Sequence, residues 1–177
     1  MIEMKVKGLT LDPLTNVPIV ILREAEGERS LPIWVGIFEA HAIAREIEEF
    51  QTPRPMTHDL IKNIINGVKG RVTRILVSAL RDNTFFAEIL LAINGSEISI
   101  DSRPSDAIAL ALRMSAPIFV EEKVLEEAKS IEFTEPEEGE GDEGEAEASE
   151  KPLDANPEDV KRWLENLKPD DFLKFEN

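Results

Sequence analysis

The chain of 177 residues contains no cysteine and no long apolar run. The absence of cysteine excludes disulfide bonds and thiolate metal sites, and nothing else in the composition indicates an oxidising compartment. No stretch approaches the roughly 18 apolar residues of a membrane-spanning helix, and the opening sequence MIEMKVK lacks the apolar core of a secretory signal. We therefore expect a cytoplasmic protein without a membrane segment.

Basic residues are also scarce, since 20 lysines and arginines stand against 36 aspartates and glutamates, a formal net charge of −16. Residues 134–177 hold 5 basic and 16 acidic residues, a net charge of −11, whereas residues 1–133 hold 15 and 20, a net charge of −5. No run of lysine and arginine forms a track for phosphate groups. Tight electrostatic binding of duplex nucleic acid is therefore not expected.

Several catalytic signatures are missing. The sequence has no zinc pattern of the His-x-Glu or His-Glu-x-x-His type, no Gly-x-Ser-x-Gly turn, no phosphate-binding glycine loop and no dinucleotide fingerprint. Hydrolase triads and nucleotide-binding enzymes are therefore not indicated. Of the two histidines, we interpret His41 as a structural or surface residue. His58, beside Asp59 at a predicted helix start, is a candidate proton shuttle.

The residues that are present predict one α+β domain followed by an appendage. A hydrophobic content of 42% is enough for one buried core, which we place in residues 1–133. Residues 134–155 predict an acidic disordered linker, because nothing there offsets the loss of chain entropy. Residues 156–177 predict an amphipathic helix that docks on the domain or on a neighbouring subunit, with one face made of Val160, Trp163, Leu164 and Leu167.

Alternating apolar residues and turn signals predict strands, of which the first three form an antiparallel meander. Helical spacing predicts a helix over 37–50, a second helix with Thr57 as its N-cap, and a short helix over 121–129. The predicted strands cover residues 2–11, 17–24, 30–35, 72–80, 84–93, 97–101 and 117–120. The second helix is expected to bury a face made of Leu60, Ile61, Ile64, Ile65 and Val68.

The stretch from Asp101 to Val120 is the one around which we expect the domain to be organised. Six apolar residues run unbroken from Ala107 to Leu112, so a helix here is apolar on every side and suits burial on several faces. A polar group precedes it, in which Pro104 suits the first helical turn. This group is either an elaborate cap or the floor of a site, and it consists of Asp101, Ser102, Arg103, Ser105 and Asp106.

An internal repeat is also predicted. Residues 16–44 align without a gap onto residues 83–111 at a constant offset of 67, with strands on strands and turns on turns. The shared order of three strands and a helix predicts a duplicated β-β-β-α unit around a central buried helix. Glu39 and Asp106 would then occupy equivalent positions, close together across a pseudo-twofold axis.

Residues 54–59 and 103–106 both read as an Arg-Pro pair leading to a hydroxyl and an acid at a helix start. One interpretation is helix capping with Arg–Asp ion pairs. The other is a site in which carboxylates bind Mg²⁺ or Mn²⁺ and arginines grip a phosphate. In that case the catalytic residues are Glu39, His58, Arg103 and Asp106, the phosphate is held by Arg54 and Arg103, and the metal ligands are Glu39, Asp59, Asp101 and Asp106.

Four motifs occur in order along the chain: LPIWVGxxEA at 31–40, PRPxTHDL at 53–60, DSRPSDAIAL at 101–110 and PIFV at 117–120. Together they resemble the bifunctional nuclease family over about residues 1–130. The resemblance implies an α+β domain and an activity that degrades both DNA and RNA. The site residues named above rest on the chemistry of their side chains and not on the resemblance.

The leading hypothesis is therefore a metal-assisted nuclease that cleaves DNA or RNA with little sequence preference. The scarcity of basic residues predicts weak binding, with single strands as the more suitable substrate. Trp34, Phe85 and Phe86 could stack bases, although at strand positions such residues more often belong to the core. The alternative is a non-catalytic ligand-binding or protein-interaction domain. Apolar strand surface and uncovered strand edges also predict a homo-oligomer, with a dimer as the first expectation.

Overall fold

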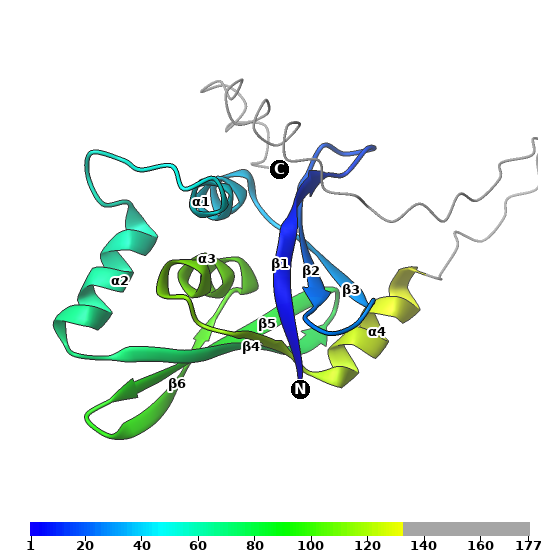
Figure 1. Ribbon diagram of the computed structural model, residues 1–177. Helices are drawn as coiled ribbons and strands as arrows, with labels where there is room; N and C mark the ends of the chain where they lie inside the picture. Colours follow the sequence, from blue (N-terminus) through cyan, green and yellow to red (C-terminus); the bar gives the residue numbers. More distant parts are fainter. Residues whose placement is uncertain (133–177) are drawn as a thin grey trace, which may run out of the picture.

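A computed structural model describes residues 1–132, with side chains through residue 128, so the predicted linker and C-terminal helix lie outside the described residues. These residues form an α+β domain with one mixed sheet of seven strands and four helices (Figure 1). The strands are β1 (Ile2–Leu11), β2 (Pro18–Glu24), β3 (Ser30–Trp34), β4 (Arg71–Arg81), β5 (Thr84–Ile93), β6 (Ser96–Ser102) and β7 (Ile118–Val120). The helices are α1 (Ile37–Ile47), α2 (Thr57–Gly67), α3 (Pro104–Met114) and α4 (Glu122–Glu132). No helix in this part of the chain is long and apolar enough to cross a membrane.

The strand order is β3-β2-β1-β7-β4-β5-β6, and it places one meander of three strands on each side of the short strand β7. The predicted first meander is confirmed, because β1 pairs with β2 and β2 with β3 in antiparallel fashion. Strand β7 pairs antiparallel with β1 and parallel with β4, which makes the sheet continuous and mixed. Each outermost strand, β3 or β6, leads directly into a helix, so that α1 and α3 start at corresponding points of the two meanders.

The order of three strands and a helix occurs twice along the chain, as β1-β2-β3-α1 and β4-β5-β6-α3. The first residues of α1 and α3, Ile37 and Pro104, are separated by the same 67 positions as the repeat in the sequence. A common origin of the two units stays a prediction.

Helix α3 lies between α1, α2 and the strands β4 and β5 (Figure 1). The residues from Ala107 to Ala111 are at most 1% exposed, and Ala40 and Ala44 of α1 are equally buried. Small alanine side chains let the two helices approach closely, while each fully buried residue such as Ile108 contributes roughly 1.5–3 kcal/mol. The packed helices therefore hold the N-terminal ends of α1 and α3 in fixed positions beside each other.

Helix α2 differs from its sequence-based prediction. Its N-cap is Met56 rather than Thr57, and Ile65 is buried as expected. The remaining residues of the predicted buried face are exposed, with Leu60 at 54% and Ile64 at 56%, because within residues 1–132 helix α2 packs mainly against α3 and no second layer covers its other face. The apolar face left uncovered consists of Leu60, Ile61, Ile64 and Val68. The predicted dimer stays a prediction, for which this face offers apolar surface.

Helix α1 ends at Ile47, three residues before the predicted end at Phe50. Glu49 adopts a left-handed backbone conformation, with φ of 53°, which stops the helical hydrogen bonds. Arg45 then closes the turn, since its Nη2 donates to the carbonyl of Phe50 at 3.2 Å and its guanidinium lies 5.4 Å from the centre of the Phe50 ring. The loop between α1 and α2 is thus anchored to the end of α1.

Candidate functional site

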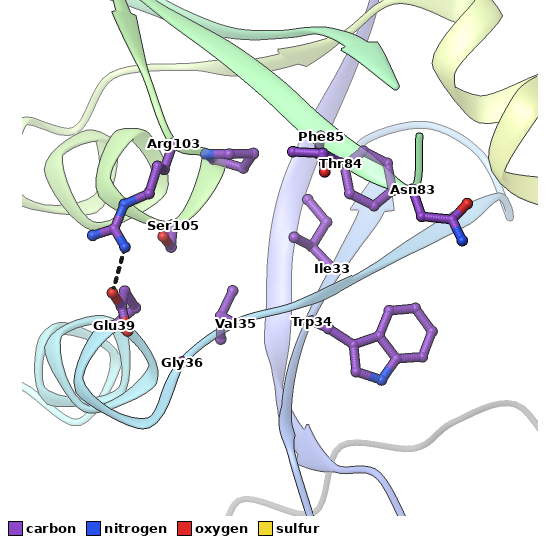
Figure 2. A pocket seen from close by; sticks show the side chains of 11 residues that line it. Ile33, Trp34, Val35, Gly36, Glu39, Asn83, Thr84, Phe85, Arg103 and Ser105 are labelled. Carbon is purple, nitrogen blue, oxygen red and sulfur yellow. Dashed lines mark hydrogen bonds and ion pairs between the residues drawn. The ribbon is translucent and has the colours of Figure 1, made fainter. Parts of the chain in front are cut away.

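Arg103, the N-cap residue of α3, joins carboxylates from two helices. Its Nε donates to Asp106 Oδ2 at 2.7 Å, and its Nη1 donates to Glu39 Oε1 at 2.7 Å (Figure 2). Hydrogen bonds between two charged groups are short and strong, so the guanidinium holds both acids in place. The alignment of residues 16–44 with residues 83–111 predicted that Glu39 and Asp106 lie close together. Both carboxylates contact Arg103.

His58 extends this arrangement from a third helix. Its Nε2 lies 3.1 Å from Asp106 Oδ1, and the residue is only 9% exposed. Because an ionised carboxylate can only accept a hydrogen bond, Nε2 is the ring nitrogen that carries the proton in this contact. The four predicted catalytic residues therefore form one contiguous group, which we call the Arg103 cluster: Glu39, His58, Arg103 and Asp106.

An acid occupies the third position of each of the helices α1, α2 and α3, and the contacts distinguish their roles. Asp59 accepts a hydrogen bond from the backbone N–H of Met56 at 2.9 Å, which is the contact of a helix cap. Glu39 and Asp106 are instead bonded to the side chain of Arg103. Asp59 thus makes the cap contact of the capping interpretation, and Asp106 makes the Arg–Asp ion pair that the same interpretation predicts, while Glu39 adds a second carboxylate to Arg103.

Asp59 also belongs to a separate ion pair with Arg113 at the C-terminal end of α3. Arg113 Nε donates to Asp59 Oδ1 at 2.7 Å, and its Nη1 donates to the carbonyl of Ala109 at 2.9 Å. The Arg113 side chain is only 4% exposed. This pair fastens α2 to α3 from inside the domain, and nothing in the sequence pattern had singled out Arg113.

The structure does not bring the other predicted site residues into the cluster. Asp101 lies on β6, where it pairs with Glu88 of β5 across the sheet. Arg54 is exposed in the loop before α2, and within residues 1–132 it makes no hydrogen bond or ion pair with the cluster. In the same part of the chain, no three or more histidine, aspartate or glutamate residues form a group that could hold a metal ion.

Glu39 and Arg103 line an open cleft of about 290 Å³ between the two halves of the sheet (Figure 2), whereas Asp106 and His58 are not among its lining residues. Gly36 lies beside Glu39, and a Cβ atom at this position would make the Glu39 carboxylate shift. Trp34 also lines the cleft and is 50% exposed, which makes the expectation of a core role wrong for this residue. The cleft is lined by Ile33, Trp34, Val35, Gly36, Glu39, Asn83, Thr84, Phe85, Arg103, Pro104 and Ser105.

The contacts keep Asp106 ionised. Burial by itself raises the pKa of the Asp106 carboxyl, but the hydrogen bonds and positive charges of Arg103 and His58 outweigh it, so that its pKa lies below the ordinary value. Burial likewise opposes a lowered pKa at Asp59, where the Met56 N–H and Arg113 have the larger combined effect. The site at neutral pH therefore presents a charged carboxylate beside a charged guanidinium.

These lowered pKa values predict that the protein loses stability in acid. A carboxyl whose pKa is lower in the folded chain than its unfolded value of about 3.9 stabilises the fold above that pH. The contribution disappears as pH falls through the folded pKa, because the unfolded chain then binds more protons. We expect the urea midpoint of unfolding to be lower at about pH 3 than at about pH 5. The midpoint of the Asp59→Asn variant should fall less over the same range. Equal midpoints for the wild type at the two pH values would contradict this.

Comparison with known proteins identifies relatives. The sequence profile of the bifunctional nuclease domain matches residues 20–132. An uncharacterized protein of Mycobacterium tuberculosis is 38% identical over 170 residues, which cover 96% of this chain and 97% of that protein. Bifunctional nuclease 1 of Arabidopsis thaliana is 30% identical over 107 residues, 58% of this chain and 33% of the relative. Bifunctional nuclease 1 of Oryza sativa subsp. japonica is 27% identical over 116 residues, which cover 64% of this chain and 35% of that protein.

The similarity to the plant proteins thus spans about a third of their length, whereas it spans nearly all of the mycobacterial protein. The domain match covers more than half of this chain, and all four residues of the Arg103 cluster fall within it. The chain belongs to the bifunctional nuclease domain family.

Proposed function

We propose that the protein is a nuclease that cleaves phosphodiester bonds of DNA or RNA at the Arg103 cluster. The observation that carries this proposal is a guanidinium held between two carboxylates at the rim of an open cleft. A phosphodiester needs a donor for its oxygens and an acid–base group for water, and the cluster contains both kinds of group. Family membership supports the same activity.

In this proposal Arg103 binds the phosphate. Its side chain is 66% exposed, so it can turn from the carboxylates toward a ligand in the cleft without unpacking the core. A guanidinium has donors in a fork that matches two phosphate oxygens. When Arg103 turns, Glu39 and Asp106 lose their shared cation and become available to other positive or proton-donating groups. The resting ion pairs therefore hold the site closed until an anion competes for Arg103.

We include Mg²⁺ or Mn²⁺ dependence in the proposal. The donor set fits a hard cation in the way that magnesium sites often do, with one or two carboxylates and the remaining positions left to water and substrate phosphate. Glu39 and Asp106 would hold the ion, which supplies polarisation of the phosphate and a more acidic bound water. Asp59 and Asp101 are left out of this set, because Asp59 is bonded to Arg113 and Asp101 lies on β6.

His58 has a positioning role in this proposal. Its Nε2–H fixes the Asp106 carboxylate from behind, and its buried side chain does not line the cleft. The proton-shuttle role predicted for His58 requires its second ring nitrogen to reach the reacting water, and it stays a prediction. His58→Gln retains a side-chain donor at the reach of Nε2 and separates the two roles, since positioning tolerates the amide whereas a shuttle does not.

The test is a cleavage assay with end-labelled single-stranded DNA and RNA. We expect fragments from both in Mg²⁺ or Mn²⁺ and none in excess EDTA, with little preference for sequence. Binding should be weak and sensitive to salt, because few basic residues are available to release counterions. Undiminished cleavage in EDTA would remove the metal from the proposal, and failure to cleave either nucleic acid would overturn the nuclease itself.

A further inference from the structure

Trp34 is the large aromatic residue that the fold leaves exposed in the cleft, and the role inferred for it rests on the proposed function. It is the last residue of β3, two positions before the glycine that precedes α1. Half of its surface is exposed, although its neighbours Ile33 and Val35 are buried. Trp34 and Arg103 line the same cleft from different sides (Figure 2). An indole that is half exposed in a cleft presents an aromatic face that a ligand can cover.

The Trp34 ring is held in a fixed orientation. Its Nε1 donates to Asp12 Oδ2 at 3.1 Å. The second carboxylate oxygen of Asp12 accepts the backbone N–H groups of Leu14 and Thr15, at 2.9 and 3.1 Å, which anchors the carboxylate within the turn after β1. A ring fixed at its polar edge cannot rotate freely, and this lowers the entropy that ligand binding would otherwise cost.

The rest of the lining suits a nucleotide. Phe85 and Ile33 supply apolar wall, and the turn residues Asn83 and Thr84 carry amide and hydroxyl groups within the same cleft. The volume of about 290 Å³ is at the small end for ligand sites, which is enough for one nucleotide unit and too little for a paired duplex. Arg103 lines the same cleft and has the donors to bind the phosphate of such a unit.

We propose that Trp34 stacks on an unpaired base of the substrate and thereby selects single-stranded DNA or RNA. Every base has an aromatic face, so stacking binds nucleotides with little regard to sequence. A base in a duplex is already stacked on both faces and must be flipped out, at a cost in free energy, before an indole can reach it. The acidic groups beside the cleft repel the phosphate backbone of the nucleic acid, so the stacked base must carry much of the affinity.

The test is tryptophan fluorescence of the full chain carrying Trp163→Phe, which leaves Trp34 as the sole tryptophan. The titrant is a short oligothymidylate in EDTA, compared with an abasic oligonucleotide of equal length and with the corresponding duplex. We expect only oligothymidylate to quench the fluorescence. In the cleavage assay, Trp34→Leu should raise KM roughly five- to a hundredfold with kcat little changed, and Trp34→Phe should restore most of the affinity. Unfolding midpoints confirm that both variants are folded.

The outcomes separate this inference from the proposed function. Quenching by the single strand in a protein that does not cleave supports stacking and overturns the nuclease. Cleavage with unchanged KM in Trp34→Leu overturns stacking and leaves the nuclease standing. Equal quenching by the abasic strand also overturns it, because phosphate binding alone would then account for the signal.

Discussion

Replacement of Arg103 by alanine is expected to lower cleavage by at least about 100-fold, which is the usual effect of removing a donor from a developing charge. The guanidinium is the one cation bonded to both Glu39 and Asp106 in the described structure. Without it, phosphate meets two carboxylates that have lost their shared cation. Arg103→Lys should recover only part of the activity, because a single ammonium group lacks the planar fork that spans two acceptors. The measurement is the initial rate on a single-stranded substrate.

The matched control is Arg74→Ala. Arg74 is bonded to the carboxylate of Glu97 at 3.2 Å, on β4 and away from the cleft lining. Both changes remove an arginine from a carboxylate contact, and each should cost less than about 1 kcal/mol of stability, because exposed ion pairs contribute little. Arg74→Ala should cleave like the wild type. If the two variants have the same activity, Arg103 has no special part in the reaction.

Replacement of Arg113 by alanine is expected to reduce the free energy of unfolding by about 2–4 kcal/mol, toward the lower part of the range for breaking a buried ion pair. The Arg113 side chain is almost entirely buried, and its loss leaves Asp59 without its cation and a void between α2 and α3. Asp59 is itself 31% exposed, so water recovers part of the loss. The measurement is urea unfolding followed by circular dichroism.

Arg113→Met distinguishes the lost charge from the lost volume, because methionine fills much of the same space. We expect it to be less destabilising than alanine and still weaker than the wild type. The Asp59→Asn, Arg113→Met double variant should regain part of the stability, since Asp59 is then neutral and only Glu46, 3.9 Å from Arg113 Nε and 37% exposed, keeps a charge that has lost its cation. A wild-type free energy of unfolding in Arg113→Ala would show that the pair does not fasten α2 to the domain.

The site residues that could be predicted are those that belong to a pattern visible in the sequence itself. The Arg-Pro-Ser-Asp motif placed Arg103 and Asp106 at a helix start, and the offset of 67 residues brought Glu39 into the same site. The first rests on the chemistry of the first helical turn, and the second on an order of elements that is repeated along the chain.

The misses depend on tertiary contacts. The exposed face of α2 has helical periodicity like any buried face, and Ile64 lies at the surface because no second layer within residues 1–132 packs on it. Trp34 follows the alternation of its strand, in which Leu31 and Ile33 are buried, and what the sequence pattern could not show is the cleft that Trp34 lines. Arg113 looks like a surface residue at a helix C-terminus until Asp59 of α2 is placed against it. Spacing along one element cannot reveal these partners.

The most direct test of the Arg103 cluster compares the wild type with Asp106→Asn and Glu39→Gln, purified identically and assayed on single-stranded DNA and RNA in Mg²⁺ or Mn²⁺. Both changes keep the size of the side chain and remove its charge, so the fold should be retained. We expect the wild type to cleave and each variant to lose at least about 100-fold in rate. Equal cleavage by all three proteins would contradict the account, because the activity would then belong to another site or to a contaminant. If none of them cleaves, the chain is a ligand-binding or protein-interaction domain, in which the acids serve as caps and ion pairs.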